Sequence, residues 1–127
     1  MKLLLDTHAF IWCDSDPGQL SATARAALLD PANSVWFSVV SVWEIVIKVQ
    51  LGKLTLRLPL PDIVAQQQAN GLQVLPVTLP HTLAVEGLPP VHKDPFDRLL
   101  VAQANVEGAE LVTADAIFKH YPVRVLW

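Results

Sequence analysis

The chain lacks two features that would each point to a particular class of protein. It has one cysteine, Cys13, so no disulfide can form within it, which fits a reducing compartment and an expected cytoplasmic location. No apolar stretch approaches the roughly 20 residues that span a bilayer. The opening segment MKLLLDTHAF reaches Asp6 too early for the apolar part of a signal peptide. We therefore expect no association with a membrane.

A block of positive charge is also missing. Nine lysines and arginines are scattered among twelve acidic residues, and the formal net charge is −3. Proteins that bind nucleic acid through a basic face cluster their positive charge on that face. Any phosphate-containing substrate of this chain must therefore be attracted by bound cations or by a few well-placed basic residues.

The chain does have a high apolar content, 52% of its 127 residues, with a mean hydropathy of +0.38. This length suits one domain with a real core, and no repeat, low-complexity tract or linker interrupts residues 1–127. Short apolar runs alternate with longer helical patterns. Such alternation predicts an α/β fold with a parallel sheet that helices cover on both faces.

The apolar periodicity and the capping residues predict the positions of the elements. We expect strands at residues 2–5, 35–38, 73–77, 110–113 and 123–126, and helices at 7–14, 22–30, 41–51, 61–70, from 80, at 95–107 and at 115–120. Between the third and fourth helices, the segment KLTLRLPLP should be extended or irregular. Its alternating Leu54, Leu56 and Leu58 could then lie on an exposed edge.

Acidic residues stand where apolar runs stop. Asp6 and Asp115 follow predicted strands, and Glu44 and Asp97 lie one turn into predicted helices. Ligands of open α/β sheets bind at the carboxyl ends of the strands, so these four side chains should meet at one edge. Four carboxylates in one place repel unless a cation or shared protons neutralise them. The pattern therefore predicts a divalent-metal site.

The donor type indicates which cation and which chemistry. Carboxylate oxygens select Mg²⁺ or Mn²⁺ over Zn²⁺, which prefers nitrogen and sulfur ligands. Such ions lower the pKa of a bound water and stabilise the leaving oxygen in a displacement at phosphorus. Phosphodiester hydrolysis is the reaction that follows most directly.

Each acidic residue taken alone also has a purely structural interpretation. Asp6, Asp94 and Asp115 can cap helices. Glu44 can complete a capping box with Ser41 and can pair with Lys48 four residues later. Asp97 stands where a negative charge favours the helix dipole, but its apolar neighbours make burial costly unless it is paired.

The four histidines are weaker candidates for site residues than the acidic residues. His8 is two residues beyond Asp6 and can reach the same edge of the sheet. The others, His81, His92 and His120, are interpreted as loop or surface residues. No pair of histidines has the spacing of a zinc site.

Four segments together resemble a known family. In order and spacing, LLLDTHAFIW, SVVSVWEIVIK, HKDPFDRLLVAQA and LVTAD are similar to the four acidic motifs of PIN-domain proteins, specifically the small VapC-type toxins of bacterial toxin-antitoxin pairs. The resemblance covers nearly the whole chain. It implies a three-layer α/β/α PIN-like domain, with a parallel central sheet of about five strands flanked by helices.

The resemblance also implies roles for individual residues. Asp6, Glu44, Asp97 and Asp115 match the positions that bind Mg²⁺ or Mn²⁺ and activate water for RNA cleavage, and Thr113 matches a hydroxyl that accompanies them. Supporting positions are Lys48, beside Glu44, and Asp94, as a helix cap or an outer ligand. For Arg98 two interpretations stand: it steadies the carboxylates or contacts phosphate, or it points outward in a salt bridge.

The family resemblance implies partners as well as a reaction. These are an RNA substrate, a cognate small antitoxin that blocks the toxin, and a second copy of the chain in a homodimer. Apolar residues surround most of the helix predicted at 41–51, which suits such an interface, although a stripe of this kind is also typical of core.

Two other functions are alternatives to a ribonuclease toxin. A catalytically silent PIN-like module would use the fold to bind RNA or protein, but all four acidic positions are present. A haloacid-dehalogenase-like phosphatase also begins with an aspartate at a strand end. That family requires a second aspartate two positions later, where this chain has His8.

Overall fold

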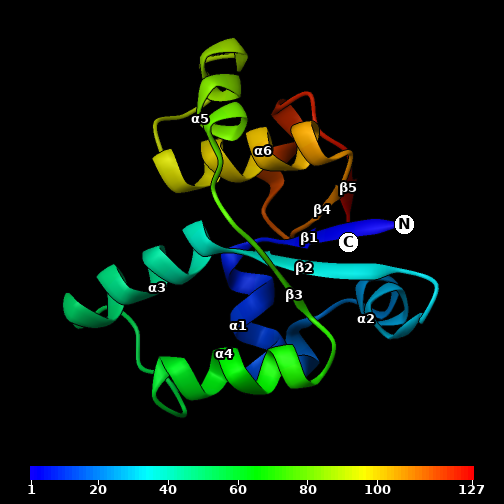
Figure 1. Ribbon diagram of the computed structural model, residues 1–127, viewed down its shortest axis with the longest axis vertical. Coiled ribbons are helices and arrows are strands. Elements are labelled where there is room, and N and C mark those ends of the chain that lie inside the picture. Colours follow the sequence, from blue (N-terminus) through cyan, green and yellow to red (C-terminus); the bar gives the residue numbers. More distant parts are fainter.

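A five-stranded parallel sheet forms the centre of the molecule. The computed structural model describes all residues, 1–127, and the strand order is β3-β2-β1-β4-β5 (Figure 1). The strands are β1 Lys2–Leu5, β2 Ser34–Ser38, β3 Gln73–Leu75, β4 Glu110–Val112 and β5 Val125–Leu126. The predicted α/β fold with a parallel sheet is confirmed, although the last three strands are shorter than expected.

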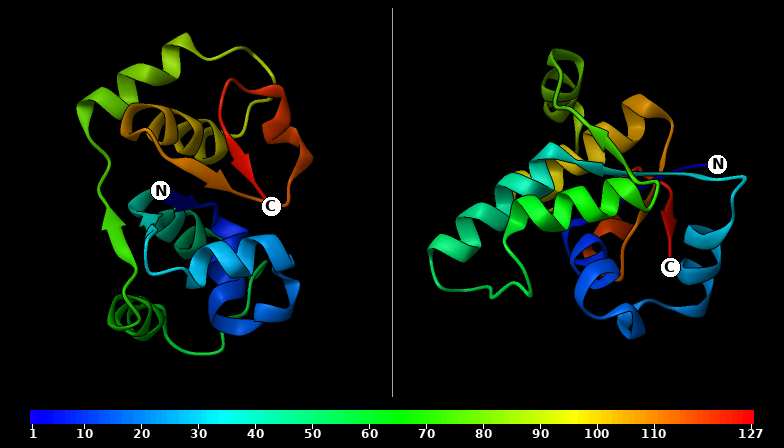
Figure 2. Two further views of the ribbon diagram at one scale, coloured as in Figure 1. Left: turned by 90° about the vertical axis from the view of Figure 1, so that its right-hand side faces the viewer. Right: turned by 60° about the horizontal axis from the view of Figure 1, so that its bottom comes forward.

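Helices cover both faces of this sheet, which gives the three-layer arrangement (Figures 1 and 2). The α-helices are α1 Thr7–Ser15, α2 Ala22–Leu29, α3 Val39–Gln50, α4 Leu60–Ala69, α5 Leu79–Ala84 and α6 Pro95–Glu107. Three short 3₁₀ turns are η1 Pro17–Gln19, η2 Val85–Gly87 and η3 Ala116–His120. None of the helices has the length and apolar character needed to cross a membrane.

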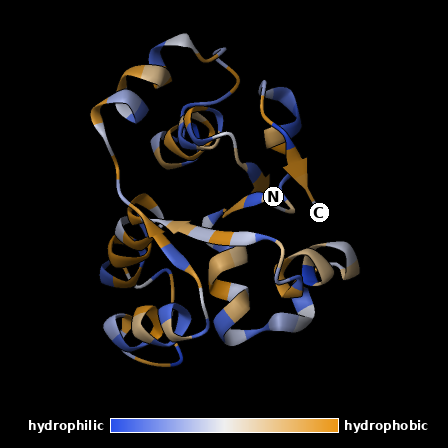
Figure 3. Cartoon of the chain, turned by 45° about the vertical axis from the view of Figure 1, so that its right-hand side comes forward, coloured by the Kyte–Doolittle hydropathy of each residue, from blue (hydrophilic) through white to orange (hydrophobic).

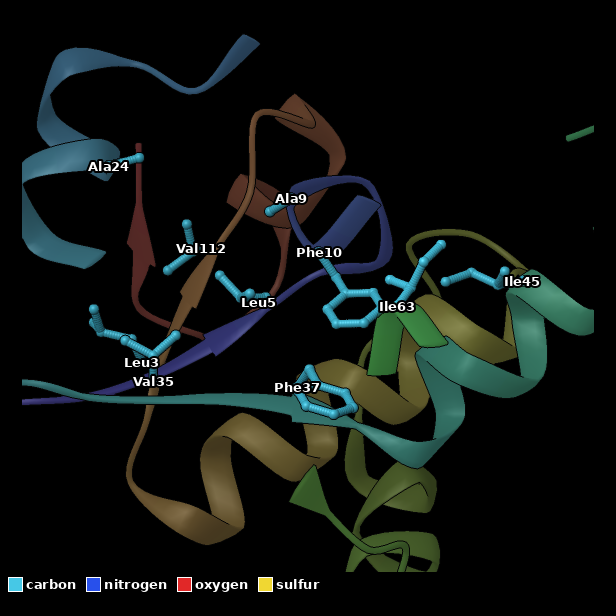
Figure 4. Close-up of a cluster of buried hydrophobic side chains, with 10 residues drawn as sticks. All are labelled: Leu3, Leu5, Ala9, Phe10, Ala24, Val35, Phe37, Ile45, Ile63 and Val112. Carbon is cyan, nitrogen blue, oxygen red and sulfur yellow. The ribbon is translucent and has the colours of Figure 1, made fainter. Parts of the chain in front are cut away.

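Two hydrophobic clusters, one on each face, hold the layers together. Successive side chains of β1 point to opposite faces, so Leu3 and Leu5 join the cluster under α1 to α4, and Leu4 joins the cluster under α6. In the first cluster the ring of Phe10 stacks on that of Phe37 at 4.7 Å (Figure 4). Hydrophobic residues accordingly occur in the strands and in the helices that flank them (Figure 3).

Helix α3 begins earlier than the sequence predicts. Its N-cap is Ser38, whose hydroxyl accepts a hydrogen bond from the backbone N–H of Val40, and not Ser41. The expected capping box of Ser41 and Glu44 is therefore wrong. Both side chains instead face Thr7, at the start of α1. A tertiary contact has taken the place of the local one.

The irregular segment after α3 is partly buried. It has no regular secondary structure, as predicted, and Gly52 before it has a φ of +70°, the left-handed conformation expected at the end of a helix. Leu54, Leu56 and Leu58 do not lie on an exposed edge, because they pack against the first hydrophobic cluster. The expectation of an exposed edge was wrong.

Candidate active site

The topology creates a crevice between β1 and β4. From β1 the chain first adds β2 and β3 on one side and later adds β4 and β5 on the other. Ligands of doubly wound sheets bind at such a switch point, outside the carboxyl ends of the strands. Asp6 directly follows β1 and Thr113 directly follows β4, and the two strands are neighbours. The fold thus places the first and last acidic motifs side by side.

Asp6 is held rigidly at this point. Its side chain is only 4% exposed, and one carboxylate oxygen accepts the backbone N–H of Ala9 at 2.7 Å, which caps α1. The other oxygen accepts the hydroxyl of Thr113 at 2.6 Å. Burial raises the pKa of Asp6, the bonds from Thr113 and Ala9 oppose this, and the charge of Asp115 raises it further.

Asp115 lies on the opposite wall of the crevice. Its backbone N–H donates to the Thr113 hydroxyl, and its Oδ1 accepts from Ile117, which caps η3. Its Oδ2 has no hydrogen bond within the protein. A cavity of about 240 Å³ separates it from the start of α1 and is lined by Asp6, His8, Trp12, Ala114 and Asp115. His8 therefore reaches the edge of the sheet, as predicted.

Glu44 approaches the crevice from α3. It is 5% exposed, and its two oxygens contact the Thr7 hydroxyl at 2.6 Å and the Lys48 ammonium at 2.7 Å. The predicted pairing with Lys48 is confirmed. Because Thr7 follows Asp6 in the chain, this bond places Glu44 beside the start of α1.

Asp97 enters from the first turn of α6. Asp94 caps this helix, accepting the backbone N–H groups of Phe96 and Asp97, so its predicted role as a cap is confirmed. Burial raises the pKa of Asp97 to about 6; the hydrogen bond from His92 opposes the rise, and the charges of Asp94 and Glu44 add to it. Asp97 Oδ1 accepts no hydrogen bond.

A chain of hydrogen bonds runs behind Asp97. The guanidinium of Arg98 donates to the Tyr121 hydroxyl at 3.2 Å, which lies 2.6 Å from His92 Nδ1. His92 Nε2 lies 2.9 Å from Asp97 Oδ2. The directions are consistent when Tyr121 donates to Nδ1 and the imidazole carries its proton on Nε2. Arg98 also donates to the carbonyl of Pro89 and forms no salt bridge, so it acts on Asp97 only through Tyr121 and His92.

The histidines predicted in loops or at the surface differ in outcome. His92 lies in the loop before α6, as predicted, but the sequence did not predict its contact with Asp97. For His81 the prediction is wrong. His81 is fully buried, with Nε2 at 2.8 Å from Glu107. The motif HKDPFDR was the available signal for His92, whereas Tyr121 stands in a segment that carries no recognisable pattern.

The carboxylate oxygens of the site are the type of ligand that a hard cation prefers. We call Asp6, Glu44, Asp97 and Asp115 the acidic rim, and in it Asp97 Oδ1 and Asp115 Oδ2 are free of hydrogen bonds. Oxygen donors and the raised pKa values of Asp6 and Asp97 fit a site that a divalent cation would neutralise. No three of the acidic, histidine and cysteine side chains are grouped closely enough to hold a metal ion. The rim thus consists of two neighbouring pairs, Asp6 with Asp115 and Glu44 with Asp97.

Comparisons with known proteins agree with this fold. A family model described as the PIN domain matches residues 3–123. A curated relative from Mycobacterium tuberculosis, named Ribonuclease VapC22, is 29% identical over 114 residues, which covers 89% of this chain and 86% of the relative.

Solved structures share the fold at lower identity. The VapBC2 complex of Rickettsia felis, bound to a promoter DNA fragment, has a chain that superposes with a TM-score of 0.71 at 17% identity, covering 98% of this chain and 97% of that chain. For DNA-bound VapBC of Salmonella typhimurium the TM-score is 0.68 at 16% identity, covering 98% and 96%.

Proposed function

The chain belongs to the PIN-domain family, and from that premise we propose that it is a divalent-metal-dependent endoribonuclease that hydrolyses phosphodiester bonds in RNA. The observation that supports the proposal is that the four acidic motifs are linked around the carboxyl end of β1. Thr113 binds Asp6, Thr7 binds Glu44, and the charge of Glu44 acts on Asp97. The ribonuclease name of the Mycobacterium relative supports the choice of substrate.

The acidic rim would hold the cation, which we propose to be Mg²⁺ or Mn²⁺. Such an ion, when bound, supplies a water of lowered pKa and charge stabilisation at the leaving oxygen. The protein's own part is positioning: Thr113 fixes Asp6, Thr7 fixes Glu44, and His92 fixes Asp97 by one oxygen each. The oxygens Asp97 Oδ1 and Asp115 Oδ2, which accept no hydrogen bond from the protein, would remain available to the cation. Lys48 offsets the negative charge of Glu44.

We further propose that this ribonuclease is the toxin of a toxin-antitoxin pair. Solved neighbours are VapBC complexes, and α3 exposes apolar side chains that a protein partner would cover: Val39, Trp43, Val46 and Val49. A groove of about 630 Å³ between α3 and the segment that leads into α4 continues this surface. We propose this surface for the antitoxin. The homodimer expected from the family remains a prediction.

A matched pair of variants tests the catalytic proposal. Asp97→Asn should fold and lose cleavage of single-stranded RNA by at least 100-fold in Mg²⁺, whereas Asp94→Asn should retain cleavage within about threefold, because asparagine caps a helix as well as aspartate. Chelation of the metal by EDTA should stop RNA cleavage by the wild-type protein, and added Mn²⁺ should restore the cleavage. Undiminished cleavage by Asp97→Asn, or activity in EDTA, would contradict the proposal.

One observation favours a second candidate, a catalytically silent module that binds RNA or protein. The acidic rim has two pairs of carboxylates and no group of three that is ready to hold an ion. Calorimetry with Mn²⁺ separates the two functions. The nuclease should bind Mn²⁺ in the wild-type form and bind it more weakly as Asp97→Asn, while a silent module should show no heat with either protein.

The toxin proposal has its own experiment. Induction of the chain in bacteria should arrest growth and produce discrete cuts in cellular RNA, and Asp97→Asn should do neither. Coexpression of a short reading frame from beside the gene should restore growth. Continued growth of cells that express active wild-type nuclease would contradict the toxin role without touching the ribonuclease activity.

A further inference from the structure

One wall of the crevice is aromatic. The cavity of about 240 Å³ beside Asp6 and Asp115 is walled by His8 and Trp12, which lie on consecutive turns of α1 with ring centroids 5.7 Å apart. His8 is exposed and Trp12 is partly exposed. No lysine or arginine lines the cavity. Its chemistry is therefore two flat rings facing two carboxylates.

The aromatic wall is fixed relative to the acidic rim. Asp6 caps α1, and the same helix carries His8 and Trp12. The two rings are thus only two and six residues from a residue of the acidic rim. The indole of Trp127 lies 5.9 Å from that of Trp12, tilted by 52°, and packs against it. A wall of this kind is preorganised, which reduces the entropy lost when a ligand binds.

The charges of the cavity select the part of RNA that can enter. A cation held by Asp6 and Asp115 would bind the phosphate that is cleaved, but no basic side chain lines the cavity beside His8 and Trp12 to neutralise a second phosphate. A nucleobase, by contrast, is neutral and has two π faces. Proteins that bind single-stranded nucleic acid place bases on aromatic side chains, and each stacked base changes affinity on the order of 5- to 100-fold. Because the basic residues of this chain form no block along its sequence, stacking is a contribution that does not depend on them.

We propose that the cavity walled by His8 and Trp12 is a subsite for one unpaired nucleobase, that of a nucleotide next to the phosphodiester at the acidic rim. The inference rests on the proposed ribonuclease function. The subsite requires the base at this position to be unpaired, because a base inside a duplex cannot leave its stack without losing its pairing. Trp12 is then a binding residue and takes no part in the chemistry.

Two substitutions at one position test the stacking. Trp12→Phe keeps a π face and should change RNA binding by less than about threefold, while Trp12→Leu keeps apolar bulk without a π face and should raise Kd and KM on the order of 5- to 100-fold. Binding would be measured by anisotropy of a labelled single-stranded RNA on the Asp97→Asn background, and KM and kcat on the active protein. A merely structural role would lower kcat and thermal stability of both variants together, which would overturn the proposal.

Removing a base from the RNA tests the same contact without altering the protein. An abasic nucleotide is moved through a cleavable oligonucleotide, and one position beside the cut should weaken binding as much as Trp12→Leu does. At that position the two changes should not add, because both remove the same contact. Full additivity at every position would overturn the proposal.

The outcomes also distinguish failure of the nucleobase subsite from failure of the proposed ribonuclease function. If the wild-type protein fails to cleave any RNA, the ribonuclease function fails. If it cleaves RNA and Trp12→Leu matches the wild type in Kd and KM, only the subsite fails. If Trp12→Leu leaves RNA unaffected and weakens binding of the antitoxin, the cavity is a site for a protein side chain and the nucleobase assignment is overturned.

Discussion

Burial of charge at the acidic rim works against the stability of the folded protein. The pKa of Asp97 rises from its ordinary 3.8 to about 6, so between these values the folded protein holds a proton that the unfolded chain has lost. The free energy of unfolding should therefore fall as pH rises through this window and stay low above it. A carboxylate kept ionised here serves function at the expense of stability.

Asp97→Asn should consequently stabilise the protein at pH 7.5. Asparagine cannot ionise, so the variant escapes both desolvation of the charge and repulsion by Glu44, and the gain should be about 1–3 kcal/mol. Urea unfolding at pH 4 and pH 7.5 measures it: the variant should show the larger gain at the higher pH. A variant less stable than the wild type at pH 7.5 would contradict this account.

His92 should act by holding one oxygen of Asp97. Glutamine can place a side-chain N–H where Nε2 stands, whereas asparagine reaches only the position of Nδ1. We expect His92→Gln to retain Mn²⁺ affinity and cleavage within about tenfold, and His92→Asn to lose more of both. Calorimetry and cleavage rates would show this, and equal losses in the two variants would argue against a positioning role.

At the level of elements, a single hydroxyl joins two layers of the fold. Ser38 caps α3 and also donates to Gln103 of α6 at 2.5 Å, and both residues are fully buried. Ser38→Ala removes the cap and leaves the Gln103 carbonyl without a partner, which should cost about 2–4 kcal/mol.

Ser21 provides the matched control for this change. It caps α2 at the surface and has no partner in another element, so Ser21→Ala should cost only about 1 kcal/mol. Denaturant unfolding of the two variants would measure the difference. Equal costs would mean that the bond between Ser38 and Gln103 contributes nothing to stability.

Local patterns predicted most of the elements, because caps and apolar periodicity act over a few residues. Helix α6 has the predicted bounds, with Asp94 as N-cap and Pro95 at its first position. The start of α3 was predicted wrongly because a contact between residues far apart in the sequence replaces the local one. Ser41 and Glu44 match a local capping box, but the Thr7 hydroxyl, 37 residues from Glu44, is their partner in the folded protein.

The positions of the acidic residues were easier to predict than the residues that hold them. Asp6 and Asp115 follow neighbouring strands and Asp97 lies in the first turn of α6, whereas Glu44 lies in the second turn of α3 and contacts Thr7. The assignment of these four residues to one catalytic site remains a prediction. His92 and Tyr121 support Asp97 across 29 residues of chain, and no spacing rule relates them. His81 looked like a surface residue because its partners, the buried Gln103 and the partly exposed Glu107, come from a helix later in the chain.

For the molecule as a whole, the scattered basic residues predict how RNA affinity depends on salt concentration. Each phosphate that a basic side chain neutralises contributes about −0.7 to the slope of log K against log salt for single strands. A net charge of −3 without a basic cluster implies few such contacts. We expect a slope shallower than about −2, measured by anisotropy from 50 to 300 mM KCl at constant Mg²⁺. A slope steeper than about −4 would reveal a basic face.

The long connection between the two walls of the crevice has a consequence for how the protein is made. The bond from Thr113 to Asp6 joins residues 107 positions apart, and β4 can pair with β1 only after that chain has been synthesised. At about 5–20 residues per second, the growing chain spends about 5–20 s with half of its crevice missing. During translation Asp6 is therefore present before β4 and Asp115, which form the other wall of the crevice. We therefore expect a nuclease built in this order to cleave no RNA, including its own messenger, until its later strands have docked.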